Sequence, residues 1–483
     1  MRVPEDRPLR PEGEYVLYWM IAARRTRNSF GLQHAAARAR ELRRPLLVLE
    51  AIRVGHRWNT ARVHRFVMDG MSVNARRFEA LGVRHLAYVE DAVGAGRGLL
   101  RALASRACLV VTDEFPGYFL PRMVAAAAER IPSRFEFVDG NGLVPLAATD
   151  RIYTTAASFR RAVHKRAAEW VEEFPVQEPL SDYDLGWAEV PDDILRRWPS
   201  RTPQDLTGAL IAELPLDHEV GPVRDRTGGS DAGDERVERF LGDGLADYPE
   251  RSRHPDAGGT SGLSPYLHFG HVGAHGVLRR IFHEEGWDPT LIREERLARR
   301  EGFWGLSPQA ESFIDELVTW RELGFVHAFH RPGGLETYDD LPEWARRTLA
   351  DHEEDERPWT YAKATFEASA THEPLWNACQ EQLRRDGGVH GYMRMLWAKM
   401  VLGWSGSPRE AFETLVALND RWAVDGRDPN GYSGVAWCFG RFDRAWGPER
   451  PVFGKVRYMT CDASRKKLRL SRWLARYSRP FDS

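Results

Sequence analysis

Short apolar runs alternate with amphipathic stretches over the first 140 residues of the chain. Five of these runs have the length and composition of buried strands, at residues 14–20, 44–51, 84–90, 108–113 and 134–140. The stretches between them are long enough for helices. Strands that alternate with helices in this way predict an α/β domain built on a Rossmann-like parallel sheet.

The pattern changes twice after residue 140. Residues 141–230 mix short helical pieces with Pro-rich and acidic segments, which predicts a long inter-domain linker with short helices. From residue 231 to residue 483 the pattern is helical almost throughout. We therefore expect a Rossmann-like domain over residues 1–140, the linker, and an all-α domain over residues 231–483. A chain of 483 residues can form two cores and still enclose a sizeable pocket.

The cysteines and the apolar runs indicate in which cellular compartment the protein belongs. Cys108, Cys379, Cys438 and Cys461 show no CxxC spacing, which argues against a disulfide framework and a zinc knuckle. The first residues, MRVPEDRPLRPEG, lack the apolar core of a signal peptide, and no run approaches the roughly 18 apolar residues of a membrane helix. We expect a cytoplasmic protein that contacts no membrane.

Charge and tryptophan are distributed unevenly along the chain. The formal net charge is only −2, so binding to nucleic acid would require a local basic surface. Residues 441–479 provide a basic segment, with twelve Lys and Arg residues against three acidic residues. Most of the 17 tryptophans follow residue 287. Indoles are large, stacking and redox-active side chains, so their positions bear on function.

Three histidines lie close together at the start of the helical part. The segment TSGLSPYLHFG, residues 260–270, places hydroxyl and glycine residues before a proline and a helical run, so its backbone N–H groups could face an anion. His268, His271 and His275 have helical spacing, but no acidic or sulfur ligand completes a metal site. We expect no bound metal.

Glu316 and Trp320 stand four residues apart in ESFIDELVTWREL and so share one face of a predicted helix. A buried acid beside an indole suits a site that hydrogen-bonds a flat carbonyl heterocycle and stacks against it. An amphipathic helix with a surface acid and a core tryptophan explains the same pattern. The local pattern alone favours this second interpretation.

Longer strings carry a family resemblance. THEPLWNACQEQL, HGYMRMLWAKMVLGW and LNDRWAVDGRDPNGYSGVAW, together with SGLSPYLHFG, LPEWARRTL and RPVFGKVRYM, resemble class II cyclobutane pyrimidine dimer photolyases over roughly residues 236–460. YVLYWMIAARR near the start resembles the antenna-type domain of the same family. The resemblance implies a deoxyribodipyrimidine photo-lyase, which binds FAD and repairs dimers in DNA by electron transfer from photoexcited, reduced FAD. It implies a monomer whose partner is damaged DNA, and leaves open whether a deazaflavin-type antenna chromophore is present.

The resemblance also implies an electron relay of tryptophans. Trp397 and Trp404 are seven residues apart on one predicted helix, hence about 10.5 Å along the same face. With Trp376 they match the class II relay that photoreduces the flavin, and Tyr361 matches an auxiliary donor. Without the resemblance, simple filling of a core would be the favoured interpretation of these tryptophans.

Around the flavin, the resemblance implies an ion pair between Arg394 and Asp425, which would stabilise a reduced, anionic ring. Asn419 matches the family's asparagine near flavin N5. The other implied FAD contacts are Tyr248, Ser261, Gly262, Leu263, Ser264, Trp320 and Asp428. Surface solvation is the alternative interpretation for the two acids.

On the lesion side, the family holds a dimer that is flipped out of the duplex. The resemblance implies that Glu316 hydrogen-bonds the pyrimidine carbonyls and that Trp320 and Trp437 line the pocket. The implied DNA contacts beyond the lesion are Arg253, Arg444, Trp446, Lys455 and Arg457, with Arg444 and Trp446 entering the gap in the duplex and the others meeting phosphates.

The chain departs from the family pattern only on the lesion side. Ser252 and Arg253 stand where class II enzymes usually carry Arg-Asn, and the segment near Gly440 is one residue shorter and lacks the usual His before Asp443. GFVHAFHRPGG after Trp320 also departs from the family's string. These changes leave a cryptochrome-like flavin photoreceptor without repair activity as an alternative. A DNA-binding flavoprotein without photochemistry is disfavoured because the three relay tryptophans are intact.

Overall fold

A computed structural model describes the chain except residues 4–6, 150 and 479–483. The described residues form two compact units, each assembled from three segments. The first unit contains Met1–Leu146, Trp170–Val237 and Leu263–Arg280, and the second contains Ala147–Glu169, Glu238–Gly262 and Ile281–Ser483. Among the described residues, no helix is long and apolar enough to cross a membrane.

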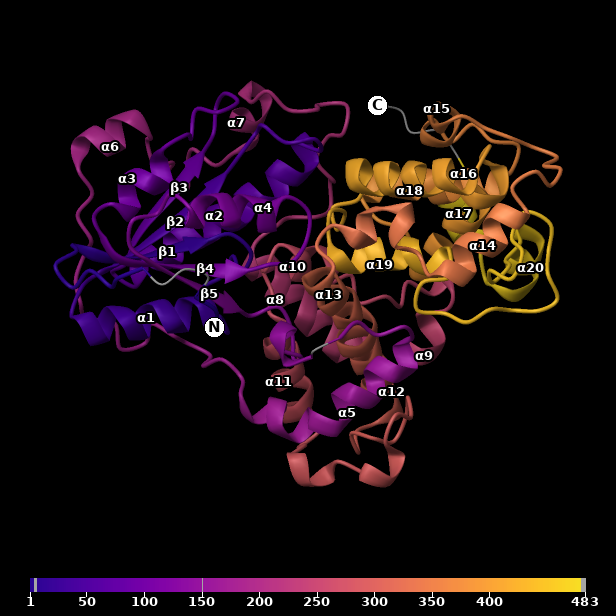
Figure 1. Cartoon of the computed structure of the whole chain (residues 1–483), viewed down its shortest axis with the longest axis horizontal. Coiled ribbons are helices and arrows are strands. Elements are labelled where there is room, and N and C mark those ends of the chain that lie inside the picture. The colour runs from indigo at the N-terminus through magenta and orange to yellow at the C-terminus, as the bar shows by residue number, and fades with distance from the viewer. Residues whose placement is uncertain (4–6, 150, 479–483) are drawn as a thin grey trace. The chain divides into compact units, whose positions relative to one another are not determined.

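The first unit is built on one parallel sheet (Figure 1). Its strand order is β3-β2-β1-β4-β5, so the chain starts in the middle of the sheet and builds outward on both sides. The predicted α/β fold is therefore confirmed. The strands are β1 Tyr15–Met20, β2 Leu46–Ile52, β3 Arg84–Val89, β4 Ala107–Glu114 and β5 Arg134–Asp139.

Both faces of this sheet are buried, which explains why the strands are almost continuously apolar. Along β1, Leu17 and Trp19 pack into one hydrophobic cluster, whereas Tyr18 and Met20 pack into another. The helices that follow the first strands begin at polar caps, as Ser29 accepts the N–H of Leu32. The helices connecting the strands are α1 Phe30–Leu42, α2 Ala61–Ala80, α3 Leu99–Ala104 and α4 Leu120–Ala128.

The carboxyl edge of the sheet, where doubly wound folds usually bind ligands, is occupied by a side chain. Asp113 at the end of β4 accepts the backbone N–H groups of Ile21, Ala22 and Ala23 over 2.8–3.0 Å. It also accepts the Tyr18 hydroxyl over 2.7 Å. These N–H groups follow β1 and would otherwise be free for a phosphate, so the carboxylate closes this position.

The rest of the first unit packs on this core. Residues of the expected linker join it, since the Trp198 indole donates to the carbonyl oxygen of Ala95 over 2.9 Å. The three histidines do not converge: His271 accepts the Gly229 N–H over 2.9 Å, and the ring of His275 lies edge-on to Phe30 at 5.2 Å. Among the described residues no group of three or more His, Cys, Asp or Glu could hold a metal ion. The helices here are α6 Asp192–Arg197, α7 Gly208–Glu213, α8 Ser230–Arg239, α10 Ser264–His268 and α11 Ala274–Glu284, of which α8 and α11 extend past the boundary of the unit.

The second unit is helical, as predicted, and α17 packs against α16, α18 and α19 in its core. Caps again set the helix starts, as Ser407 accepts the Glu410 N–H ahead of Pro408 at the start of α18. Two segments are π-helical, at Phe240–Gly244 and Asp315–Trp320. The α-helices are α5 Ala156–Glu172, α9 Tyr248–Arg251, α12 Pro308–Ile314, α13 Arg321–His330, α14 Glu343–Asp351, α15 Lys363–Glu367, α16 Pro374–Asp386, α17 Gly391–Trp404, α18 Pro408–Trp422, α19 Pro429–Cys438, α20 Cys461–Lys467 and α21 Ser471–Tyr477.

Candidate functional site

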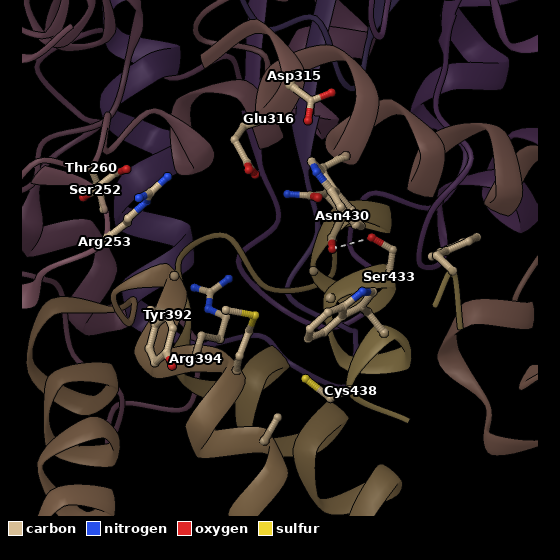
Figure 2. A pocket seen from close by; sticks show the side chains of 18 of the residues that line it. Ser252, Arg253, Thr260, Asp315, Glu316, Tyr392, Arg394, Asn430, Ser433 and Cys438 are labelled. Atoms are coloured by element: carbon tan, nitrogen blue, oxygen red, sulfur yellow. Dashed lines mark hydrogen bonds between the residues drawn. The ribbon is translucent and has the colours of Figure 1, made fainter. Parts of the chain in front are cut away.

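The second unit encloses a cavity of about 570 Å³, a volume within the range of sites for small molecules and cofactors. Figure 2 shows side chains from separate segments around it, with Glu316 and Asn430 above and Arg394 rising from α17 below. Of the residues singled out from the sequence, the cavity wall contains Tyr248, Arg253, Glu316, Trp320, Arg394, Trp397, Asn419 and Trp437. Residues far apart in the chain are thus brought to one site.

Glu316 and Trp320 lie on the π-helical turn Asp315–Trp320 rather than on a regular α-helix. Both line the cavity, so the interpretation with a surface acid and a core tryptophan does not describe them. The Glu316 side chain is exposed to the cavity but otherwise surrounded by protein, and this burial raises its pKa to about 7, with the charge of Asp315 adding to the effect. The carboxyl can therefore carry a proton near neutral pH.

A buried ion pair supports this turn from behind. Arg160 on α5 donates two hydrogen bonds to Asp315, over 2.6 Å and 2.9 Å, and both side chains are largely buried. A bidentate guanidinium–carboxylate pair fixes orientation as well as distance. Arg160 thus holds the residue next to Glu316, which the sequence alone did not indicate because the two residues are 155 positions apart.

Arg394 reaches the cavity from α17 and pairs with Asp425 in the loop between α18 and α19 (3.1 Å between Nη2 and Oδ1). Asn419 on α18 is almost fully buried and lines the same cavity. The loop is fixed by Asp420, which accepts the Tyr432 hydroxyl and the Arg427 backbone N–H over 2.8 Å each. A cation and a residue that carries a side-chain amide therefore both line the cavity.

The three tryptophans form a connected series. Trp397 lines the cavity, and its backbone carbonyl accepts the Trp376 indole N–H over 2.9 Å. The rings of Trp376 and Trp404 lie 6.2 Å apart at 68°. Trp376 and Trp397 are buried, whereas Trp404 is half-buried and lies 6.2 Å from the ring of Tyr361. The series therefore leads from the cavity wall toward the surface.

Of the remaining predicted cofactor contacts, only Tyr248 belongs to the cavity wall. Tyr248 packs edge-on against Phe313 at 5.6 Å, and burial raises the pKa of its hydroxyl. Asp428 caps α19 by accepting the Asn430 N–H over 2.7 Å. Ser261, Gly262, Leu263, Ser264, Asp425 and Asp428 are not among the residues of the cavity wall, and Leu263 and Ser264 belong to the first unit.

Arginines and tryptophans alternate beside the cavity. The guanidinium of Arg457 lies 5.3 Å from the Trp437 ring and 4.1 Å from the Trp446 ring, and Arg444 lies 4.2 Å from the same Trp446 ring. Asp443 accepts from Arg457 Nε over 3.0 Å and from the Trp446 indole over 3.2 Å. We call Trp437, Arg457, Trp446 and Arg444 the Trp–Arg stack. It is organised by cation–π contacts and one shared carboxylate.

The shortened segment near Gly440 has a fixed conformation. Gly440 has a φ of 102°, and a Cβ there would lie 2.8 Å from the Trp344 ring. Only glycine therefore fits at this position without a shift of the neighbouring side chain. The segment joins Trp437 to Asp443, Arg444 and Trp446, so its geometry sets how these parts of the Trp–Arg stack are connected.

Other cations of the basic segment already have acidic partners. Lys455 pairs with Glu449 over 3.2 Å, and Arg469 and Arg476 lie 3.7 Å and 3.8 Å from acidic oxygens. Arg465 pairs with Glu373. Arg479 lies outside the described residues. The density of positive charge in the sequence thus overstates the positive charge that this surface presents.

Several residues of the cavity wall were not predicted, among them Tyr392, Asn430, Arg300 and Glu301. Tyr392 lies within the HGYMRMLW string, which was the available signal. Arg300 lies in an irregular loop, where Glu311 accepts the backbone N–H groups of Gly302 and Leu306. No periodicity marks such a loop, so its position could not be predicted.

Comparison with known proteins gives the family. No family model matches the chain. It is 31% identical to the deoxyribodipyrimidine photo-lyase of Methanothermobacter thermautotrophicus over 468 residues, which cover 96% of this chain and 94% of that protein. Two crystal structures share the fold at a TM-score of 0.69: a class III photolyase from Agrobacterium tumefaciens, 16% identical over 96% of this chain and 86% of that chain, and a Synechocystis cryptochrome, 15% identical over 96% and 88%. Similarity to a curated enzyme along nearly the whole of both sequences shows that the chain belongs to the deoxyribodipyrimidine photo-lyase family.

Proposed function

We propose that the chain is a class II enzyme that uses light and FAD to repair cyclobutane pyrimidine dimers in DNA. The observation that carries the proposal is the shared cavity. Residues expected at the flavin (Arg394, Asn419) and residues expected at the lesion (Glu316, Trp437) line the same space. The chain is also similar, over nearly its whole length, to a relative that is a deoxyribodipyrimidine photo-lyase, and this similarity supports the same conclusion.

The residues of the cavity fit a flavin. Its wall offers the Arg394 cation, the Asn419 amide and the Trp397 ring, which suit a flat, hydrogen-bonding and redox-active heterocycle. Arg394 is already oriented by Asp425, so little side-chain ordering remains to be done on binding. When bound in its reduced form and excited by light, FAD supplies the electron that opens the cyclobutane ring.

The other side chains of the cavity act on the dimer. With a pKa of about 7, Glu316 is protonated in a substantial fraction of molecules near neutral pH and can donate a hydrogen bond to a pyrimidine carbonyl. Trp320 and Trp437 offer rings on which bases can stack. A positioned donor and stacking rings would hold the dimer in one orientation and exclude water from it.

Damaged DNA reaches the cavity by base flipping, which costs least for a lesion whose stacking and pairing are already weakened. The Trp–Arg stack adjoins the cavity through Trp437, so Trp446 and Arg444 are suited to fill the gap left in the duplex. Arg253, an exposed cation of the cavity wall, is suited to bind a phosphate.

We further propose that the protein is a cytoplasmic monomer. A deazaflavin-type antenna chromophore is suggested only by the family resemblance.

The test is a repair assay on a short oligonucleotide that carries one thymine dimer. The purified protein is loaded with FAD, reduced chemically, mixed with the oligonucleotide and illuminated with blue light, with a dark sample as control. We expect dimer loss in the light only. Persistence of the dimer under light, with the flavin fully reduced, would contradict repair and favour the cryptochrome-like alternative. The Synechocystis cryptochrome shares the fold of this chain.

A further inference from the structure

Ring contacts continue beyond Trp404. The imidazole of His372 lies 4.9 Å from the Trp404 ring at 65°, and it stacks on the Trp359 ring at 4.4 Å and 16°. Trp359 is 50% exposed, although tryptophan is a large and mostly apolar side chain. A series of ring contacts therefore runs from Trp376 through Trp404 and His372 to the surface.

Hydrogen bonds fix the geometry of this series. The Tyr361 hydroxyl shares a hydrogen bond with His372 Nδ1 over 2.8 Å and accepts the His372 backbone N–H over 3.0 Å. The Tyr361 N–H donates to the Trp404 carbonyl oxygen over 2.8 Å. His372 is thus held through both its ring and its backbone. The imidazole therefore offers Trp359 a surface that the fold keeps in place.

Core packing does not explain Trp359. The tryptophans at the inner end of the series are buried and could be there only to fill space, but half of the Trp359 surface faces solvent. Its defined contact is instead with the one imidazole that also touches Trp404. An oxidisable ring is thereby placed where a soluble molecule can reach it.

We propose that Trp359 is the surface end of the electron relay and that a soluble thiol reduces it there. The proposal rests on the proposed function, because the relay needs a photoreducible flavin as its electron acceptor. One electron leaves the Trp359 indole and crosses His372 to oxidised Trp404, so Trp404 becomes neutral again and Trp359 becomes the radical cation. A thiolate then returns one electron to Trp359, and two of the resulting thiyl radicals join to form a disulfide.

Four variants isolate this step. Trp359→Phe keeps a ring that can stack on His372 but removes the oxidisable indole, whereas Trp359→Tyr restores an oxidisable ring. Trp187→Phe is the matched control, because Trp187 is 43% exposed and belongs to the first unit. Tyr361→Phe tests whether the relay ends at the tyrosine instead.

Flash photolysis of the FAD-loaded, oxidised proteins would follow the indole radical, and steady illumination with a thiol would follow flavin reduction. We expect Trp359→Phe to lose the long-lived radical and to photoreduce severalfold more slowly, with Trp359→Tyr and Trp187→Phe close to wild type. Repair by chemically reduced protein should be unchanged in all of them, because the relay is not needed once the flavin is reduced.

Two results would overturn this proposal alone. If Trp359→Phe matches wild type in radical lifetime and photoreduction, or if only Tyr361→Phe is slow, the relay does not end at Trp359. In either case repair by the reduced wild-type protein would leave the proposed function intact. A wild-type protein that binds no FAD would instead overturn the proposed function, and this proposal with it.

Discussion

Glu316 combines two properties at the residue scale: its carboxyl is reachable from the cavity, yet burial raises its pKa to about 7. The unfolded chain ionises this group near pH 4.5, whereas the folded chain keeps the proton until about pH 7. The free energy of unfolding therefore falls as pH rises from 4.5 to about 7. Above pH 7 the ionised carboxylate lowers stability by its full amount.

Glu316→Gln removes this penalty. We expect the variant to unfold at the same temperature as wild type below pH 4.5 and at a higher temperature above pH 7. The gain in the free energy of unfolding above pH 7 is on the order of 1 kcal/mol once solvent access in the cavity is allowed for. Thermal unfolding from pH 4 to pH 8.5 measures this. Glu301→Gln is the control, because Glu301 is an exposed carboxyl of the same cavity wall. Parallel curves for wild type and Glu316→Gln would contradict the raised pKa.

The rate of repair should also depend on the protonation of Glu316. If protonated Glu316 donates to the dimer, single-turnover repair falls as pH rises through about 7, whereas Glu316→Gln repairs at a rate that is independent of pH in this range. A wild-type rate that is flat from pH 6 to pH 8.5, with the flavin kept reduced, would show that the Glu316 proton is not used.

The Arg394–Asp425 pair is predicted to contribute to FAD binding. Arg394→Ala removes a cavity cation and leaves Asp425 without this partner, so we expect FAD affinity to fall by about 10–100-fold, corresponding to roughly 1.4–3 kcal/mol. Arg409→Ala is the control, because its pair with Asp339 is exposed on both sides. Equilibrium titration with FAD measures the change. Equal affinities for the two variants would contradict the assignment of Arg394.

At the scale of elements, the Trp–Arg stack joins the end of α19 to the segment that precedes α20 and acts as one structural unit. Arg457→Ala removes the cation shared by Trp437 and Trp446 and one partner of Asp443. We expect a loss of about 1–2 kcal/mol in the free energy of unfolding and greater quenching of tryptophan fluorescence by acrylamide. Arg444→Ala, which removes only one ring contact, should have a smaller effect. The opposite order would show that Arg457 does not organise the stack.

Elements with strong periodicity could be predicted from the sequence, and irregular ones could not. The strands are almost continuously apolar because both faces of the sheet are buried, so all five were located within a few residues. The π-helical turn carrying Glu316 has no distinct sequence pattern, because the formation of i→i+5 hydrogen bonds depends on the packing around the turn. The support from Arg160 arises only in the folded chain, since 155 residues separate it from Asp315.

At the scale of the whole molecule, charge predicts a weak dependence of DNA binding on salt. The net charge is −2, and many cations of the basic segment already pair with acids. With about 0.9 units of slope per phosphate contacted, we expect log affinity to fall with log salt at a slope of roughly −3 to −4. Titrations of a dimer-containing duplex at several salt concentrations measure it. A slope near −10, which some DNA-binding proteins show, would mean that the acidic partners release their arginines on binding.

The central claim is that one cavity holds the flavin and the lesion together. The most direct measurement is the fluorescence lifetime of reduced FAD in the protein, with a dimer-containing oligonucleotide or the same oligonucleotide undamaged. Electron transfer to an adjacent dimer would shorten the lifetime, so we predict a clear decrease with the damaged strand only. Identical lifetimes with both strands, at concentrations that saturate binding, would contradict a shared cavity.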